Sequence, residues 1–186
     1  MTTAQRVFHH RHLWRLTPEA FAAGATMLAR AAGQVRGPIT AVVGIAKGGL
    51  PFAVVAADLL DVPRFMVSAR HNATDGLYEQ ATGSVTCDAG QMAHDLDGLA
   101  LAGTILLVDD ICGSSATLAA VRSAMRPHLD VRARVVTAAL CLNAGAITRP
   151  DLWLWNVADW VVFPWEGDQP TGETTRLRIP AGVQTA

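Results

Sequence analysis

One short segment, residues 105–117, limits the possible folds of this chain more than any other part of it. It begins with four apolar residues, Ile-Leu-Leu-Val, which are typical of a strand buried in a parallel sheet. Two carboxylates, Asp109 and Asp110, follow, and a turn of small residues then leads into an alanine-rich stretch with helical character. Ligands of an open α/β sheet bind beyond the carboxyl ends of its strands, and free N–H groups at a helix N-terminus favour anions.

The segment therefore predicts a phosphate-binding turn beside two carboxylates. This combination suits a phosphorylated sugar with neighbouring hydroxyls. The alternative is a structural strand that ends in an acidic turn and a capped helix.

A second strand, turn and helix come earlier in the chain. Residues 39–45 resemble a buried strand and residues 52–60 a helix, and Lys47, Gly48 and Gly49 lie between them. The two glycines let backbone amides approach an anion closely, and Lys47 adds a positive charge. Two such turns after two separate strands indicate a phosphate ligand more strongly than either turn alone.

The composition fits one globular domain. The chain has 186 residues, of which 51% are hydrophobic and 17% are charged, and its net charge is −1. This charge gives no basic surface of the kind that binds nucleic acid, and no apolar stretch reaches the roughly 18 residues of a membrane span. The first residues lack the apolar core of a signal peptide, and three widely spaced cysteines do not indicate a disulfide framework. We therefore expect a cytoplasmic protein without a membrane or nucleic-acid partner.

The remaining segments alternate between helix and strand. Thr17 and Pro18 predict the start of a helix, with Thr17 as its N-cap. Further elements are expected as strands at residues 64–69, 104–108 and 134–142, and as a helix at residues 115–125. This alternation favours an α/β fold with a mostly parallel sheet flanked by helices.

The N-terminal residues include three histidines, His9, His10 and His12. A metal site is one interpretation of such a cluster. The simpler interpretation is an N-terminal arm that packs on a neighbour.

A polar stretch at residues 70–97 interrupts the alternation of helix and strand. The pattern at residues 84–87 predicts a short hairpin within it. A polar excursion of this length is typical of a lid or a disordered loop. The side chains that could reach an active site from it are His71, Tyr78 and Glu79, although solvated loop residues are the alternative for each.

The segment at residues 105–117 resembles the 5-phosphoribosyl 1-diphosphate (PRPP) motif of type I phosphoribosyltransferases. Two positions depart from that motif, because Ser115 replaces the usual Gly and Gly113 stands where purine salvage members often carry an Asp that acts as general base. The resemblance implies that Asp109 and Asp110 orient the ribose hydroxyls and a hydrated Mg²⁺. The PRPP-binding residues that it implies are Asp109, Asp110, Ile111, Cys112, Gly113, Ser114, Ser115, Ala116 and Thr117.

The earlier turn resembles the diphosphate-binding loop of the same family, in which a basic residue precedes two glycines. The resemblance implies diphosphate binding by Ala46, Lys47, Gly48 and Gly49. It also implies that the peptide bond between Ala46 and Lys47 can be cis.

Near the C-terminus, residues 159–166 resemble the base-binding end of xanthine, guanine and hypoxanthine phosphoribosyltransferases. By this resemblance Trp160 stacks on the base, Val161 offers backbone groups, Phe163 also belongs to the base site, and Glu166 takes the acidic role. The alternative is that the tryptophans of this region, Trp153 and Trp155 in particular, only cover the sheet.

These patterns together predict the type I phosphoribosyltransferase fold as a single domain over residues 1–186. We expect a core at about 37–145, a small hood built from the N-terminal arm and about 150–186, and a mobile lid at about 70–97. The implied activity is Mg²⁺-dependent transfer of the 5-phosphoribosyl group from PRPP to a nucleobase, with a 6-oxopurine favoured and diphosphate released. The catalytic residues would be Asp109, Asp110, Lys47 and Glu79, in a homodimer. The alternatives are a non-purine acceptor and a non-catalytic regulator that senses PRPP.

Overall fold

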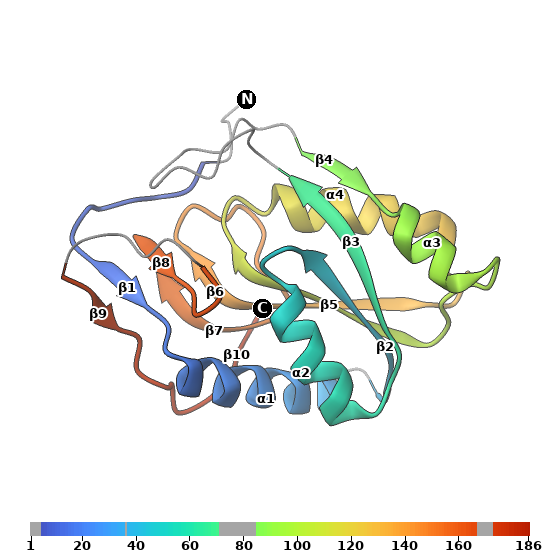
Figure 1. Ribbon diagram of the computed structural model, residues 1–186, viewed down its shortest axis with the longest axis horizontal. Coiled ribbons are helices and arrows are strands. Elements are labelled where there is room, and N and C mark those ends of the chain that lie inside the picture. Colours follow the sequence, from blue (N-terminus) through green and yellow to red (C-terminus); the bar gives the residue numbers. More distant parts are fainter. Residues whose placement is uncertain (1–4, 36, 71–84, 167–172) are drawn as a thin grey trace.

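The computed structural model describes residues 5–35, 37–70, 85–166 and 173–186. Its main sheet has seven strands in the order β10-β7-β6-β5-β2-β3-β4 (Figure 1). The five strands from β7 to β3 in this order are parallel, whereas β10 and β4 pair antiparallel at the two edges. The strand bounds are Ile39–Ala46 (β2), Arg64–Arg70 (β3), Thr86–Asp88 (β4), Thr104–Cys112 (β5), Arg134–Asn143 (β6), Leu152–Val157 (β7) and Gln184–Thr185 (β10).

Helices cover both faces of this sheet, as Figure 1 shows. Helices α1 (Pro18–Val35) and α2 (Leu50–Leu60) pack on one face, and α3 (Gly90–Leu96) and α4 (Ala116–Met125) pack on the other. A short 3-10 turn, η1 (Arg126–His128), follows α4. The expected α/β fold with a mostly parallel sheet is confirmed.

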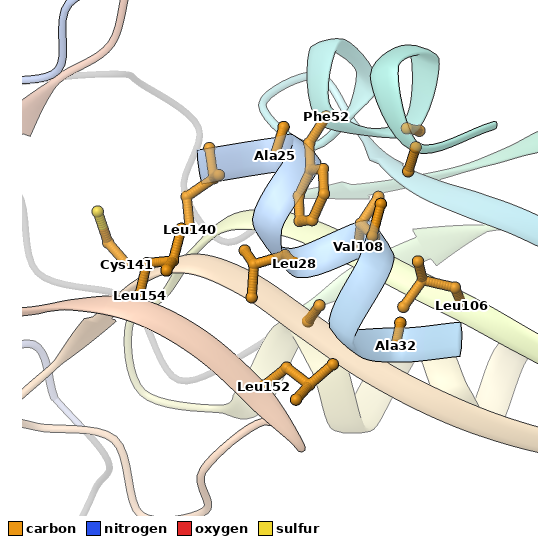
Figure 2. Close-up of a cluster of buried hydrophobic side chains, with 14 of the residues drawn as sticks. Ala25, Leu28, Ala32, Phe52, Leu106, Val108, Leu140, Cys141, Leu152 and Leu154 are labelled. Atoms are coloured by element: carbon orange, nitrogen blue, oxygen red, sulfur yellow. The ribbon is translucent and has the colours of Figure 1, made fainter. Parts of the chain in front are cut away.

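The core between α1, α2 and the sheet is drawn in Figure 2. Leu28 of α1 and Phe52 of α2 are fully buried and lie over Leu106 of β5 and Leu140 of β6. Burying each such side chain contributes about 1.5–3 kcal/mol. The four apolar residues before the acidic pair therefore hold β5 at the centre of the molecule.

The strand order places a topological switch point between β2 and β5. From β2 the chain moves outward to β3, whereas from β5 it moves in the opposite direction to β6 and β7. The connections that follow β2 and β5 therefore leave the sheet on opposite sides, and ligands of open α/β sheets bind at such a point. Both turns that were expected to bind anions lie at this point.

A second, three-stranded parallel sheet has the order β8-β1-β9. Its strands are β1 (Leu13–Arg15), β8 (Trp160–Val162) and β9 (Thr175–Arg176), so that the two ends of the chain meet in it. This sheet lies where the hood was expected, and the division of the chain into core and hood stays a prediction. β7 and β10, which fall within residues 150–186, belong to the main sheet.

Local sequence signals explain the start of α1 but not α3. The backbone N–H of Ala20 donates to Thr17 Oγ1 at 3.2 Å, which confirms Thr17 as the N-cap.

Within the stretch expected as a lid, residues 86–96 instead form β4 and α3, because β4 pairs with β3 and the buried Met92 and Leu96 anchor α3 on the sheet. His71, Tyr78 and Glu79 lie outside the described residues. No helix in the described part of the chain is long and apolar enough to cross a membrane.

Candidate active site

The acidic pair lies inside β5 rather than after it. This strand continues to Cys112, past the expected end at Val108, and Asp109 pairs in register with Ala139 of β6. Asp109 is buried and Asp110 is partly exposed, and the backbone N–H of Asp110 donates to Asp109 Oδ1 at 3.0 Å. The strand therefore fixes both carboxyl groups on a rigid backbone at the switch point.

The Lys47 turn packs directly against this pair. A Cβ at Gly48 would collide with the carboxylate of Asp110 in its present position, so the missing side chain lets the two segments approach this closely. The Ala46–Lys47 peptide bond is cis, as the family resemblance implied, and Lys47 is exposed to solvent. The structure thus brings together the acidic pair and the turn expected to bind diphosphate.

Burial raises the pKa of both carboxyl groups. For Asp109 the pKa rises well above its usual range, first because of burial and then because of the neighbouring charge of Asp110. Burial also raises the pKa of Asp110, and the Arg6 guanidinium is the first of the influences that oppose this rise. The pair is therefore a site where a positively charged ligand would be stabilised.

The turn after β5 is fixed by a side-chain link to another loop. Ser115 has a φ of 77°, which is the left-handed region, and it lies where the family motif has glycine. Its hydroxyl donates to the carbonyl oxygen of Thr148 at 2.5 Å and accepts from the Thr148 N–H at 3.0 Å. Ser114 beside it is buried, and Ala116 and Thr117 form the first turn of α4. Backbone N–H groups at a helix start are a common binding site for anions.

Two other residues of the motif are parts of the core. Burial raises the pKa of Cys112 to about 11, and its sulfur lies 3.7 Å from Ser115 Oγ and from the carbonyl oxygen of Thr148. The side chain of Ile111 is partly buried and packs towards α1 and α2. These residues shape the turn from behind.

The structure adds Arg6, a residue that the sequence analysis did not single out. A Cβ placed at Gly113 would collide with the Arg6 side chain. The Arg6 side chain therefore fills the space that a side chain at position 113 would occupy. Its positive charge also lowers the pKa of both Asp109 and Asp110, against the larger effect of burial. The missing side chain at Gly113 was a signal for this contact, although it gave no indication of the contacting residue.

The N-terminal arm that carries Arg6 packs on this chain's own C-terminal elements. The Asn143 side chain accepts from the Val7 N–H at 2.8 Å and donates to the Val7 carbonyl oxygen at 3.0 Å. The buried Asp159 carboxylate accepts the backbone N–H groups of His10, Arg11 and His12 at 2.6, 3.3 and 3.1 Å. The arm is therefore anchored on both sides of Phe8.

The expected base-binding residues lie in and after β8, and they differ in how far their side chains are buried. Trp160 is partly exposed, and its ring centroid lies 6.0 Å from that of Phe8. Val161 is buried in register with Trp14. The Phe163 ring is buried and stacks on Trp165, so it cannot face a base, which corrects its assignment to the base site.

Glu166 accepts the backbone N–H of Phe163 at 3.2 Å, which ties the acidic residue to its own turn. Trp153 and Trp155 are buried in β7, and Trp155 Nε1 donates to the Arg178 carbonyl oxygen at 2.7 Å. For these two tryptophans the structural alternative is therefore correct.

The residues at the switch point suit a Mg²⁺ ion that is also bound by a ligand. They do not form a complete metal site built from protein side chains alone. Mg²⁺ prefers oxygen ligands and is commonly held by one or two carboxylates together with substrate phosphates, and Asp109 and Asp110 supply such oxygens. Across the described ranges, no group of three or more His, Cys, Asp or Glu side chains could hold a metal, and this includes His9, His10 and His12. Any metal at the acidic pair would thus be shared with a ligand.

Comparisons with known proteins agree with this geometry. A family model described as the phosphoribosyl transferase domain matches residues 16–168, whereas no curated protein sequence matches the chain. The structure of a purine phosphoribosyltransferase from Pyrococcus horikoshii has a TM-score of 0.63 at 20% identity and covers 86% of this chain and 97% of that one. A Helicobacter pylori xanthine-guanine-hypoxanthine phosphoribosyltransferase has a TM-score of 0.64 at 20% identity and covers 86% and 95%. At these identities the similarity concerns the fold.

Proposed function

Because this chain belongs to the phosphoribosyltransferase family, we propose that it transfers the 5-phosphoribosyl group of PRPP to a nucleobase, with a 6-oxopurine as the favoured acceptor. The observation that carries the proposal is the meeting of the acidic pair with both turns at the switch point between β2 and β5. The products are a nucleotide and diphosphate. A homodimer and a cytoplasmic location stay predictions.

Each part of the site has a role in this reaction. The carboxylates of Asp109 and Asp110 orient the ribose hydroxyls, and the N–H groups at residues 114–117 hold the 5′-phosphate. Because the Ser115 hydroxyl is bonded to Thr148, this residue contributes through its backbone, whereas Ser114 and Thr117 offer their side chains. Lys47 and Gly48, next to Asp110, hold the diphosphate as it leaves.

The role of Mg²⁺ follows from the same charges. The ion would be held by Asp109 and Asp110 together with PRPP oxygens, and it would supply positive charge that stabilises the leaving diphosphate. The acidic pair keeps the ribose hydroxyls in place while positive charge develops on the ribose ring.

The proposed binding site for the acceptor base consists of Trp160 and the residues around it. A planar base is bound by an aromatic face together with a few fixed polar groups. Trp160 offers the face, and backbone groups of Val161 and the carboxylate of Glu166 are the candidates for polar contacts. Glu79, the other carboxylate expected here, lies outside the described residues.

The test is diphosphate release from PRPP and Mg²⁺ with a panel of purine and non-purine bases. Asp110→Asn should reduce PRPP binding and turnover by more than about tenfold, because charge-assisted contacts contribute roughly 1.5–3 kcal/mol. Trp160→Ala should raise the KM of the base and leave PRPP affinity nearly unchanged. The matched control is Asp97→Asn, the same change at the exposed left-handed end of α3, where Asn is tolerated.

The outcomes separate the proposal from its alternatives. Transfer to another heterocycle while all purines stay inert would assign a non-purine acceptor. Mg²⁺-dependent PRPP binding without transfer to any acceptor would assign a PRPP sensor. A wild-type protein that does not bind PRPP would contradict all three functions.

A further inference from the structure

The position that follows β5 holds a cation that belongs to a distant part of the chain. Gly113 has no side chain of its own, and the space into which a Cβ would project contains Nε, Cγ and Cδ of Arg6. Gly113 lies between the acidic pair and the turn at residues 114–117. The arginine is therefore part of the wall of the proposed active site.

Arg6 is presented by an anchored backbone. The backbone N–H and carbonyl oxygen of its neighbour Val7 both bond to the side chain of the fully buried Asn143, at the end of β6. Two residues after Asn143, a Cβ at Gly145 would collide with the carbonyl oxygen of Gln5, so the loop after β6 packs tightly on the arm. This packing positions the guanidinium on a fixed segment of chain.

The same arm also contacts the aromatic residue expected to stack on the acceptor. Phe8, two residues after Arg6, lies beside Trp160 with a ring-centroid distance of 6.0 Å and an interplanar angle of 37°. The side chains on either side of Val7 thus reach two parts of one site: Arg6 reaches the end of β5, and Phe8 reaches β8. An acceptor ring on Trp160 lies next to the arm that carries Arg6.

We propose that Arg6 is a specificity-determining residue that selects an acceptor in its anionic form, an inference that rests on the proposed transferase function. A guanidinium stays protonated and has no acceptor atom, so it cannot remove a proton from the acceptor. A fixed positive charge instead favours a ligand that is already negative. The charge can reside on the ring itself or on a carboxylate attached to it.

The chemical step is balanced without a protein base. The lone pair of a ring nitrogen attacks C1 of the phosphoribosyl group, and a C–N bond forms. The C1–O bond to diphosphate breaks, and its electron pair leaves with the diphosphate. An acceptor whose charge is on the ring has already given a proton to solvent before it binds. An acceptor whose charge is on a carboxylate keeps its ring N–H, and that proton passes to water as the C–N bond forms.

The test compares acceptors that differ in charge at one mildly alkaline pH. Xanthine loses a ring proton near neutrality, hypoxanthine stays neutral, and the pyrimidine orotate carries a carboxylate. For the wild-type protein we expect kcat/KM to be higher for an anionic acceptor than for hypoxanthine. Preference for xanthine would place the charge on the ring, and preference for orotate would place it on a substituent.

Variants of the arm test the residue itself. Arg6→Gln should lower kcat/KM for the preferred anionic acceptor by more than about tenfold and change that for hypoxanthine by less than about threefold. Arg6→Lys should restore part of the loss, because it keeps the charge. Arg11→Gln is the matched control, since the exposed Arg11 side chain lies on the same arm and only its backbone N–H contacts Asp159. PRPP affinity measured by calorimetry shows that each variant is folded.

Two results would overturn the inference and leave the transferase function intact. One is a wild-type protein that is active but prefers hypoxanthine over both anionic acceptors. The other is an Arg6→Gln variant whose kcat/KM falls equally for all acceptors, or whose only change is weaker PRPP binding. A wild-type protein that is inactive with every acceptor would instead contradict the proposed function, and this inference with it.

Discussion

Ser115 shows how one residue can replace a glycine in a binding turn. Its φ of 77° is a conformation that a side chain normally disfavours by roughly 1–2 kcal/mol. The two hydrogen bonds between its hydroxyl and the backbone of Thr148 compensate for this, since each contributes about 0.5–1.5 kcal/mol. The bonds also tie the turn at residues 114–117 to the loop between β6 and β7.

Substitutions at Ser115 should separate these two contributions. Ser115→Ala removes both hydrogen bonds and keeps a Cβ in the disfavoured region, so we expect a loss of about 1–3 kcal/mol in the free energy of unfolding. Ser115→Gly removes the same bonds but relieves the backbone, and it should be about 1 kcal/mol more stable than the alanine variant. Urea unfolding of the two variants measures the difference.

An exposed serine of the adjoining helix provides the control. Ser123 lies on the solvent face of α4, and Ser123→Ala should change stability by less than about 0.5 kcal/mol. An alanine variant at position 115 that is as stable as the glycine variant would show that the positive φ is not maintained in solution.

At the scale of elements, the central strands could be predicted but the peripheral ones could not. The apolar runs at β2, β5 and β6 indicated buried parallel strands, and each was found within a few residues. β7 fell within the expected hood because its tryptophans were grouped with the other aromatic residues near the C-terminus, although Leu-Trp-Leu-Trp is itself a run typical of a buried parallel strand. α3 was missed because seven residues with two buried apolar side chains give little periodicity.

The N-terminal arm could not be predicted because its contacts are not local. Val7 bonds to a side chain 136 residues away, and His12 bonds to one 147 residues away. These bonds join single backbone groups to Asn143 and Asp159, and such contacts leave no periodic pattern in the sequence. The position of Arg6 in the site depends on them.

Weakening the anchor at Asn143 should release the arm. Asn143→Asp keeps the shape of the side chain but replaces the donor to the Val7 carbonyl oxygen with a negatively charged oxygen. We expect faster hydrogen exchange at Val7 and at the neighbouring arm residues, and faster tryptic cleavage after Arg6 and Arg11. Acceptor kcat/KM should fall as it does in Arg6→Gln.

A second asparagine allows a matched comparison. The exposed Asn156 only accepts a hydrogen bond, from Trp153 Nε1 at 2.9 Å, and Asn156→Asp keeps that acceptor. Exchange at the arm should be the same in this variant as in the wild type. Unchanged exchange in Asn143→Asp would mean that the bonds to Asp159 alone hold the arm.

At the scale of the whole molecule, the candidate site combines parts with different origins. The acidic pair and the two turns come from the centre of the sheet and could be predicted from local sequence. Arg6 and Phe8 come from the first residues, and Trp160 comes from a strand that pairs with β1 near the N-terminus. A ligand that bound across this candidate site would thus be linked to the packing of the arm and of β8.

The charges buried at this site should also make stability depend on pH. Burial raises the pKa of Asp109 and Asp110 in the folded protein, whereas in the unfolded chain an Asp titrates near about 3.9. Between these values the folded state binds more protons than the unfolded state, so the free energy of unfolding falls as the pH rises through the folded pKa. Below the unfolded value both states are protonated and the loss disappears.

Asp110→Asn should therefore stabilise the ligand-free protein at neutral pH while it weakens PRPP binding. The variant removes one of the two charges and also relieves Asp109 of the neighbouring charge that raises its pKa. In urea unfolding with a chelator present, its advantage over the wild type should be close to zero near pH 4 and should grow towards pH 8. Saturating Mg²⁺ and PRPP should reverse the order, because a ligand at 100 times its Kd stabilises the wild type by about 2.7 kcal/mol. A variant that is less stable than the wild type at neutral pH without ligand would contradict this prediction. It would show that the favourable interactions of the ionised Asp110 outweigh the cost of burying its charge.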